Sequence, residues 1–525
     1  MHSEHVLQRL ESLIEISLSL SATIKVDDIL DKILTGAKTL CQADGGTLYK
    51  VNRDVLTMAI VKSDSLQIDQ QNSSQTPLTI PLYNEQGENN LHNIVSYAYH
   101  NQTTVNVADA YDQSQFDFSG TKAFDRSHQY RTQSVLTIPL KNHEYEIIGL
   151  LQLINAQDDH HNIIAFNAAL QKLAECFASQ AAIVLTKQQL ISDLHKTFES
   201  FVELVATAID EKSPHTAKHC RRVPELTLMI ADAVHASDTD YFRDFQMSSK
   251  DRYELKIAAW LHDCGKITTP EYVIDKATKL ETIFDRIQLV ETRYEVLLRD
   301  AEIAFLKQKI AALEQGHPLP ANAERDFHDT QHRLREELAF LQRVNIGGEF
   351  MTEEDQQRVR TLATTTWSLQ NQQTPLLTEN EVYNLTIARG TLTQEERDII
   401  NNHIVATIQM LKKIPFPKHL QNVPEYAGGH HERIDGKGYP KGLKREEMSV
   451  YARIMGLADI FEALTACDRP YSKQNVKTVS KALAILEKMV ENGHIDPDIH
   501  RVFIEQKVYK HYANHYLEPF QIDVA

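Results

Sequence analysis

The feature that most constrains this chain is a predicted buried helix that runs into charged and metal-binding side chains. Apolar spacing predicts the helix over 255–261, and His262, Asp263 and Lys266 follow it. We expect Gly265 to stop the helix. An ionised carboxylate in such a place costs free energy unless a cation compensates it, and a metal ion does so most strongly. Because adjacent His and Asp residues are also common in solvated or hydrogen-bonded pairs, a metal centre here requires further ligands.

Further candidate ligands occur on inward-facing positions of other predicted helices and in one constrained loop. His219 shares a helix face with Val223 and Ile230. A capping box at Thr393 opens a helix that is expected to place one set of residues on a single inward face: Ile399, His403, Thr407 and Met410. The whole candidate set has five histidines and two aspartates: His219, His262, Asp263, His403, His430, His431 and Asp459.

This ligand set predicts the kind of metal site. Nitrogen and oxygen ligands without cysteine exclude the usual structural zinc site and suit iron or manganese, with zinc or nickel tolerated. One metal rarely takes so many protein ligands. A binuclear centre bridged by one carboxylate is therefore predicted.

Length and composition limit the class of protein. A chain of 525 residues is expected to form two or three domains. It has no apolar run near the about 20 residues that a membrane span needs, and its first residues lack the features of a signal peptide, so we expect a cytoplasmic protein. Its five cysteines suggest neither a disulfide framework nor a zinc ribbon. The net charge of −17 argues against a nucleic-acid polymer as partner.

The N-terminal part predicts a mixed α+β domain without a metal-ligand cluster. A helical pattern over 5–40 is followed by strand-like runs with helical segments between them, which favours an antiparallel sheet. These runs are 46–51, 56–61, 134–140 and 147–155.

Two further stretches are predicted to be long helices. Apolar residues recur at heptad spacing from Leu170 through Phe177, Val184, Ile191, Phe198 and Val205, later joined by Leu194, Phe201 and Ala208. This helix either packs on its own domain or forms a parallel dimer that carries a signal between domains. A charged, leucine-rich stretch over 281–390 predicts an inserted helical hairpin with a break at 316–320, and we assign it no chemistry.

The N-terminal region, residues 1–186, resembles a GAF domain. The resemblance rests on three segments, 109–112, 130–136 and 149–155. It implies a role in dimerisation, or the sensing of a small ligand such as a cyclic nucleotide. Three further residues look like the motif of cyclic-nucleotide-binding members, although Thr121 stands where that motif has asparagine: Lys122, Phe124 and Asp125.

The C-terminal region, residues 213–525, resembles the HD-GYP family of phosphohydrolases, an all-α domain that here follows a linker helix over 187–212 and contains the insertion. The resemblance rests on motifs that occur in the family's order: 215–223, 262–266, His403, 430–432, 435–440, 458–459 and 468–471. By this resemblance one metal is held by His219, His262, Asp263 and Asp459. Asp263 then bridges to a second metal held by His403, His430 and His431. Some members hold a third metal through a glutamate one turn before the first histidine; this chain has His215 there, which leaves the number of metals open.

The resemblance implies an enzyme that cleaves cyclic di-GMP, with either pGpG or GMP as the end product. Hydrolysis of 3′,3′-cyclic GMP-AMP and a catalytically silent cyclic dinucleotide receptor are the alternatives. Lys266 is expected to hold a phosphate oxygen or to protonate the leaving oxygen, unless it only caps the helix end. Glu432 and Asp435 are expected to orient ligands or to fix the loop. Three further residues are expected to contact the dinucleotide: Tyr439, Arg469 and Lys473. A homodimer is expected.

Overall fold

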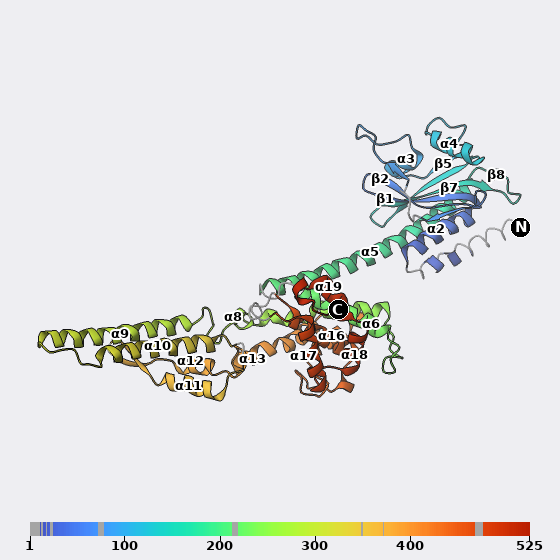
Figure 1. Cartoon of the computed structure of the whole chain (residues 1–525). Coiled ribbons are helices and arrows are strands. Elements are labelled where there is room, and N and C mark those ends of the chain that lie inside the picture. The colour runs from blue at the N-terminus through green and yellow to red at the C-terminus, as the bar shows by residue number, and fades with distance from the viewer. Residues whose placement is uncertain are drawn as a thin grey trace. The chain divides into compact units, whose positions relative to one another are not determined.

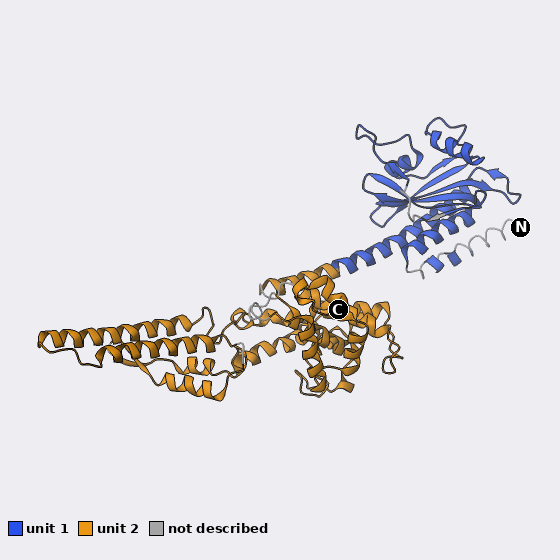
Figure 2. Ribbon diagram, in the orientation of Figure 1, with its two compact units in different colours: residues 1–197 blue, residues 198–525 orange. Residues whose placement is uncertain are grey.

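The computed structural model describes residues 11, 14–16, 18–20, 25–71, 78–212, 219–347, 350–370, 372–467 and 476–524. The chain divides into two compact units, residues 1–197 and residues 198–525 (Figure 2). The long helix α5 (Ala168–Lys212) contributes its first part to unit 1 and its last turns to unit 2 (Figure 1). Among the described helices, none is long and apolar enough to cross a membrane.

Unit 1 contains an antiparallel sheet with strand order β3-β2-β1-β7-β6-β5, in which β4 pairs with β2 and β8 with β7. The predicted α+β class with an antiparallel sheet is therefore confirmed, since the predicted strand-like runs correspond to β1, β2, β6 and β7. The elements in chain order are α2 (Val26–Cys41), β1 (Ala43–Asn52), β2 (Val55–Ser63), β3 (Ile68–Gln71), β4 (Thr79–Pro81), α3 (Ile94–Asn101), β5 (Val105–Val107), α4 (Ser119–His128), β6 (Val135–Lys141), β7 (Ile147–Gln157) and β8 (Ile163–Ile164).

Both faces of this sheet are covered. Successive side chains of a strand point to opposite faces, so the neighbours Leu150 and Leu151 of β7 enter different cores. Leu151 packs with Ile33 of α2 and Phe177 of α5, whereas Leu150 packs with Val95 of α3. The sheet therefore lies between α2 and α5 on one side and α3 on the other (Figure 1).

The GAF motif residues make contacts within unit 1. Asp125 is buried and accepts hydrogen bonds from the backbone N–H of Thr132 (2.8 Å) and the hydroxyl of Tyr111 (3.0 Å). Lys122 lies over the Tyr111 ring, 5.1 Å from its centroid, and Phe124 is exposed. Asp125 thus fixes the segment that leads into β6.

Unit 2 is helical around one main hydrophobic core, and its predicted all-α class is confirmed apart from two short strands. The elements before and within the insertion are α6 (His219–His235), α7 (Ser249–Leu261), the 3-10 helix η1 (Cys264–Thr268), α8 (Glu271–Ile274), α9 (Ile287–Glu314), α10 (Ala323–Asn345), α11 (Glu353–Ala363), β9 (Thr366–Leu369), β10 (Gln372–Pro375) and α12 (Glu379–Leu385). After it come α13 (Gln394–Asn401), α14 (His403–Leu411), η2 (Lys418–Leu420), α15 (Val423–Gly428), η3 (Arg445–Glu447), α16 (Val450–Thr465), α17 (Val479–Glu491), α18 (Pro497–Glu505), α19 (Val508–Tyr516) and η4 (Pro519–Gln521).

The insertion has a hydrophobic cluster of its own. Helices α9 and α10 form the predicted hairpin, and Tyr294, Leu334 and Phe340 are buried between them and the following elements. The antiparallel pair β9 and β10 was not predicted. These strands are short, and only Trp367 is a large apolar residue with a side chain partly buried against the cluster.

Helix α5 corrects the heptad register that the sequence suggested. Phe198 and Val205 do not lie on a free seam, because both pack against the core of unit 2. The large exposed apolar side chains of α5 are Ile183, Leu190, Ile191, Leu194, Phe201 and Leu204. Ile191, Leu194 and Phe201 belong to the predicted heptad pattern, whereas the other three lie on an adjacent stripe. The two stripes are neighbours on the helix surface, so apolar spacing alone did not separate them.

The helix after Thr393 is also different from the prediction. It ends at Asn401 and restarts at His403, and the second segment buries Ile404 and Leu411 beside His403 and Thr407. The expected inward residues Ile399 and Met410 are exposed by 39% and 38%. The restart changes which face of the helix is turned to the core.

Candidate metal centre

All seven predicted ligand residues come together in unit 2. They lie where helices begin or end: at the start of α6, at the end of α7, at the start of α14 and just after α15, with Asp459 inside α16. Each backbone there is fixed by the apolar core that these helices share.

The first group consists of His219, His262 and Asp263, with Asp459 beside it. The Nε2 atom of His219 lies 3.3 Å from Asp263 Oδ2 and 3.2 Å from Asp459 Oδ1. The Nε2 atom of His262 lies 3.2 Å from Asp263 Oδ2 and 3.9 Å from Asp459 Oδ1. Two imidazole nitrogens and two carboxylates thus point at one place.

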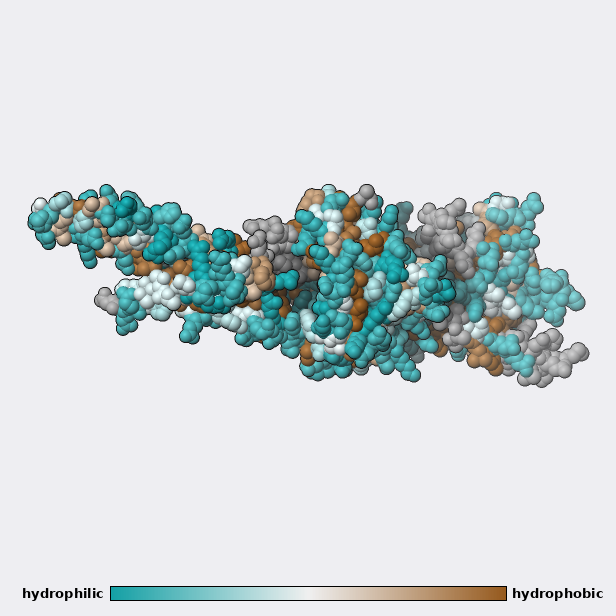
Figure 3. Space-filling model, turned by 60° about the horizontal axis from the view of Figure 1, so that its bottom comes forward, coloured by the Kyte–Doolittle hydropathy of each residue, from teal (hydrophilic) through white to brown (hydrophobic). Residues whose placement is uncertain are grey.

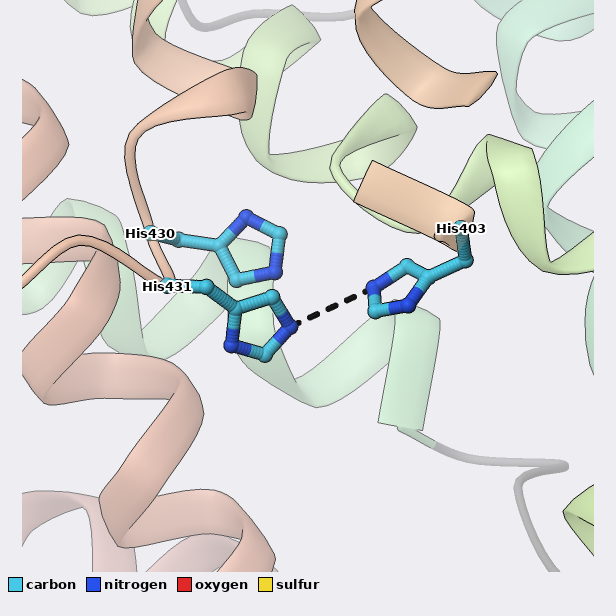
Figure 4. A group of neighbouring side chains, drawn as sticks. All are labelled: His403, His430 and His431. Carbon is cyan, nitrogen blue, oxygen red and sulfur yellow. Dashed lines mark hydrogen bonds between the residues drawn. The ribbon is translucent and has the colours of Figure 1, made fainter. Parts of the chain in front are cut away.

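The second group consists of His403, His430 and His431, whose rings face one another in Figure 4. The Nε2 atoms of His403 and His431 are 3.2 Å apart (Figure 4). The other oxygen of Asp263, Oδ1, lies 3.3 Å from Nε2 of His403. One carboxylate therefore turns one oxygen to each group.

Backbone carbonyls orient three of the histidines in the same way. The Nδ1 atoms of His262, His403 and His430 lie 2.8, 2.5 and 2.6 Å from the carbonyl oxygens of residues 259, 400 and 427. A carbonyl oxygen only accepts, so Nδ1 must carry the proton. The lone pair is then on Nε2, the nitrogen that faces the group.

Buried polar atoms without a hydrogen-bond partner show that these residues fit a metal. Among the described residues such atoms include Nε2 of His219, His262 and His430, and Oδ1 of Asp263. An unsatisfied buried polar group costs about 1–3 kcal/mol. Metal ions at the two groups would satisfy all four atoms.

The ionisation states match those that a cation requires. Burial lowers the pKa of His431 to about 4, and it lowers the pKa of His430 well below its usual range together with the neighbouring His431. Burial opposes ionisation of Asp263, but the Lys266 ammonium together with His262 and His219 outweighs it and holds the pKa of Asp263 well below its usual value. Burial also opposes ionisation of Asp459, but the hydrogen bond with His219 and the charges of the surrounding histidines together outweigh it, so the pKa of Asp459 is also low. At neutral pH the site therefore presents neutral imidazoles at His430 and His431 and ionised carboxylates at Asp263 and Asp459.

The nearby cysteines are not thiolate ligands. Burial raises the pKa of Cys264 to about 11 and that of Cys220 well above its usual value. Both stay protonated at neutral pH, and thiolate is the form that binds metal. The two groups of candidate ligands among the described residues consist of histidine and aspartate side chains and so offer nitrogen and oxygen atoms.

Gly265 has a different role from the predicted one. Helix α7 ends at Leu261, and Gly265 lies inside η1. A Cβ atom on Gly265 would lie 2.0 Å from the carbonyl oxygen of His403, and its N–H donates to Thr407 Oγ1 at 2.9 Å. The glycine is needed so that the segment carrying Asp263 can approach the start of α14.

Glu462 is a functional candidate that the sequence did not predict. It is fully buried on α16, one turn after Asp459, and its Oε2 lies 2.5 Å from Nδ1 of His219. Its Oε1 lies 3.1 Å from Arg222. Burial disfavours a charged His219, but Glu462 together with Asp263 and Asp459 outweighs this and raises the pKa of His219 well above its ordinary value. The signal in the sequence was a second carboxylate on an almost wholly apolar helix.

The loop after the paired histidines is fixed by its own carboxylates. Glu432 accepts hydrogen bonds from the N–H groups of Lys441 (2.8 Å) and Leu443 (2.9 Å). Asp435 pairs with both guanidinium arms of Arg433. Tyr439 stacks on His431, with ring centroids 4.9 Å apart. Glu432 and Asp435 thus hold the loop, and Tyr439 holds a histidine ring.

Lys266 contacts the site, and the remaining predicted residues cannot be placed. The Nζ atom of Lys266 lies 2.6 Å from Asp263 Oδ2. Lys266 is therefore an ion-pair partner of the carboxylate that lies between the two groups. Arg469, Lys473 and His215 lie outside the described residues.

Comparison with known proteins agrees with this division of the chain. A family model described as GAF domain matches residues 25–185, and two models described as HD domain match residues 216–344 and 355–499. The chain combines a GAF domain with an HD domain. The two HD matches are parts of one site, because His219, His262 and Asp263 lie in the first, and His403, His430, His431 and Asp459 in the second.

Curated relatives match part of the chain. A 3′3′-cGAMP-specific phosphodiesterase of Vibrio cholerae is 40% identical over 110 residues, which are 21% of this chain and 22% of the relative. A cyclic di-GMP phosphodiesterase of Pseudomonas aeruginosa is 37% identical over 117 residues, 22% of this chain and 26% of the relative. A cyclic di-GMP phosphodiesterase of Thermotoga maritima is 35% identical over 117 residues, which are 22% of this chain and 30% of the relative. The chain thus spans less than a third of the length of each.

The contact between Glu462 and His219 predicts an effect on metal affinity. We expect Glu462→Gln to lower the affinity for Mn²⁺ about 10- to 100-fold, because the carboxylate orients His219 and makes its imidazole a stronger donor. Isothermal titration of the metal-stripped protein measures this. Glu254→Gln is the matched control, since Glu254 is another buried carboxylate of this unit but hydrogen-bonds Asn422. Equal affinities in the two variants would contradict the assignment.

Proposed function

We propose that this chain is a metal-dependent phosphodiesterase that hydrolyses a cyclic dinucleotide. The observation that carries the proposal is the position of Asp263, one oxygen of which faces each of two groups of buried, unsatisfied ligand atoms. A bridged pair of cations at these groups, for which iron or manganese is proposed, supplies an acidified water and neutralises charge on a phosphodiester.

The protein's own residues would do the remaining work. Lys266 is the cation closest to Asp263, and its side chain is one-fifth exposed, so it can turn to a phosphate oxygen or to the leaving oxygen. Stacking by Tyr439 holds His431 in place. Arg469 and Lys473 are proposed to bind the second phosphate of the dinucleotide.

The proposed substrate is cyclic di-GMP, converted to pGpG and then to GMP. A second candidate is 3′,3′-cyclic GMP-AMP, which is favoured by the 40% identity to a relative named for that substrate. A turnover panel with both dinucleotides on Mn²⁺- or Fe²⁺-loaded protein tests the proposal. Metal-loaded protein that binds both and cuts neither would support a silent receptor instead.

Asp263 gives the sharpest test of the centre. We expect Asp263→Ala to lose hydrolysis and most of the metal of both groups, because its two oxygens face different groups. Metal analysis and product chromatography measure the two effects. Asp232→Ala, which removes an exposed carboxylate paired with Arg252, is the control and is expected to change neither. Retention of both metals in Asp263→Ala would disprove the bridging role.

We also propose that the chain is a parallel homodimer through α5. The exposed residues Leu190, Leu194, Phe201 and Leu204 occupy a and d positions of one heptad register, in which Thr197 stands at the d position between Leu194 and Phe201, and this is the pattern of a two-stranded seam with one polar position. The GAF match supports a sensory role for unit 1, with a small ligand such as a cyclic nucleotide as the proposed signal.

The proposed α5 seam predicts that one charged side chain placed in it weakens the dimer. We expect Leu194→Lys to weaken the dimer by at least about tenfold, because two like charges would be buried opposite each other. Sedimentation equilibrium measures the dissociation constant. Gln189→Lys adds the same charge to an exposed position off the seam and is expected to leave the dimer intact. If both variants dissociate equally, the seam is wrong.

The end of α5 is tied to the segment that carries Lys266. The Nζ atom of Lys212 donates to the carbonyl oxygens of Lys266 (3.3 Å), Ile267 (2.5 Å) and Thr269 (2.6 Å). We propose that a change in α5 reaches the site through this contact.

Loss of this contact should affect turnover more than metal content. We expect Lys212→Met to lower kcat about tenfold with metal content unchanged, because η1 loses its anchor and Lys266 its position. Lys256→Met is the matched control, since Lys256 also contacts α5, through Glu199 (3.1 Å). An unchanged kcat in Lys212→Met would rule out this route.

A further inference from the structure

The outer half of α9 carries a stripe of large apolar side chains that the hairpin does not cover. Ile303, Leu306, Ile310 and Leu313 are exposed by 48%, 45%, 53% and 72%. The other side of the helix faces α10, where Phe305 stacks on Phe327 with ring centroids 4.7 Å apart. Figure 3 shows apolar side chains among hydrophilic ones along this arm, at the left. An uncovered apolar stripe on a helix marks an interaction surface.

The spacing and identity of these residues define the kind of partner. They occupy alternating a and d positions of two heptads, with isoleucine at both a positions and leucine at both d positions. β-branched residues at a with leucine at d favour two parallel strands over other arrangements. A second copy of the same helix fits this preference.

The flanking charges select the same arrangement. Glu302 and Lys309 occupy g positions, and Lys307 and Glu314 occupy e positions; all four are exposed. In a parallel pair each g residue faces an e residue of the other helix, so Glu302 meets Lys307 and Lys309 meets Glu314. An antiparallel pair with the same apolar contacts would instead bring Lys307 and Lys309 of both helices together at its centre.

We propose that residues 302–314 of α9 pair in parallel with the same residues of a second copy of this chain. The pairing ends toward the base of the hairpin, where Arg299 occupies a d position and Glu295 would face Asp300 of the other helix. Two heptads are short for a stable coiled coil, so the pairing rests on the dimer proposed through α5, which raises the local concentration of the second copy.

Cross-linking of the full-length chain tests the pairing and its direction. In a Cys176→Ser background, which removes an exposed thiol, Leu306→Cys is expected to form a disulfide-linked dimer under mild oxidation. Gln308→Cys, at an exposed position off the stripe, is the control and is expected to stay unlinked. Equal linking at the two positions, or none at Leu306→Cys, would overturn the proposal.

Two further measurements separate this pairing from the α5 dimer. Leu190→Cys reports on α5 alone: linking there without linking at Leu306→Cys overturns only the α9 pairing, and linking at neither position overturns both. Glu302→Lys and Lys307→Glu are each expected to raise the dimer dissociation constant about tenfold, and the double variant is expected to return it toward the original value. A double variant as weak as the single ones would refute the charge pairing.

Discussion

The ionised carboxylate of Asp263, fully enclosed by protein, is the constraint on which the rest of unit 2 depends. Burial alone would keep this carboxyl protonated, yet Lys266 and the surrounding imidazoles hold its pKa low. Such a charge is tolerated only where cationic partners converge from several directions. This explains why the ends of three helices and one loop meet at a single place instead of being spread over the surface.

Helix ends serve this purpose because the backbone there has unused hydrogen-bonding groups. At His262 and His430 the ring Nδ1 bonds the carbonyl three residues earlier, and His403 repeats the pattern. A helix end therefore fixes the position of a histidine and also the nitrogen that stays unprotonated. Gly265 allows one such end to touch another. The metal-binding geometry thus follows from ordinary backbone chemistry.

The sequence predicted the parts of the structure that repeat a simple pattern, and it missed those that depend on packing. The strands of unit 1 and the inward position of His219 follow from local periodicity. The register of α5 does not follow from local periodicity. Phe198 packs against the core of unit 2, and heptad spacing alone does not reveal that contact. The contact of Glu462 with His219 was missed for a related reason: the residues are 243 positions apart, and no local pattern joins them.

The insertion shows how a long segment can be placed in the chain between two ligand-bearing segments without separating them. The chain leaves η1 and returns to α13 at nearly one point, where buried Lys276 contacts Glu396 (2.7 Å) and Asn384 (2.9 Å). Lys279 adds hydrogen bonds to the carbonyl oxygens of Leu385 (3.0 Å) and Ile387 (2.8 Å). Since the cost of closing a loop grows only slowly with its length, fixing the two ends matters far more than the number of residues between them. The ion pair of Lys276 with Glu396 also joins the segment that follows Asp263 to the helix that precedes His403, so the base of the insertion and the two groups of ligands share one set of contacts.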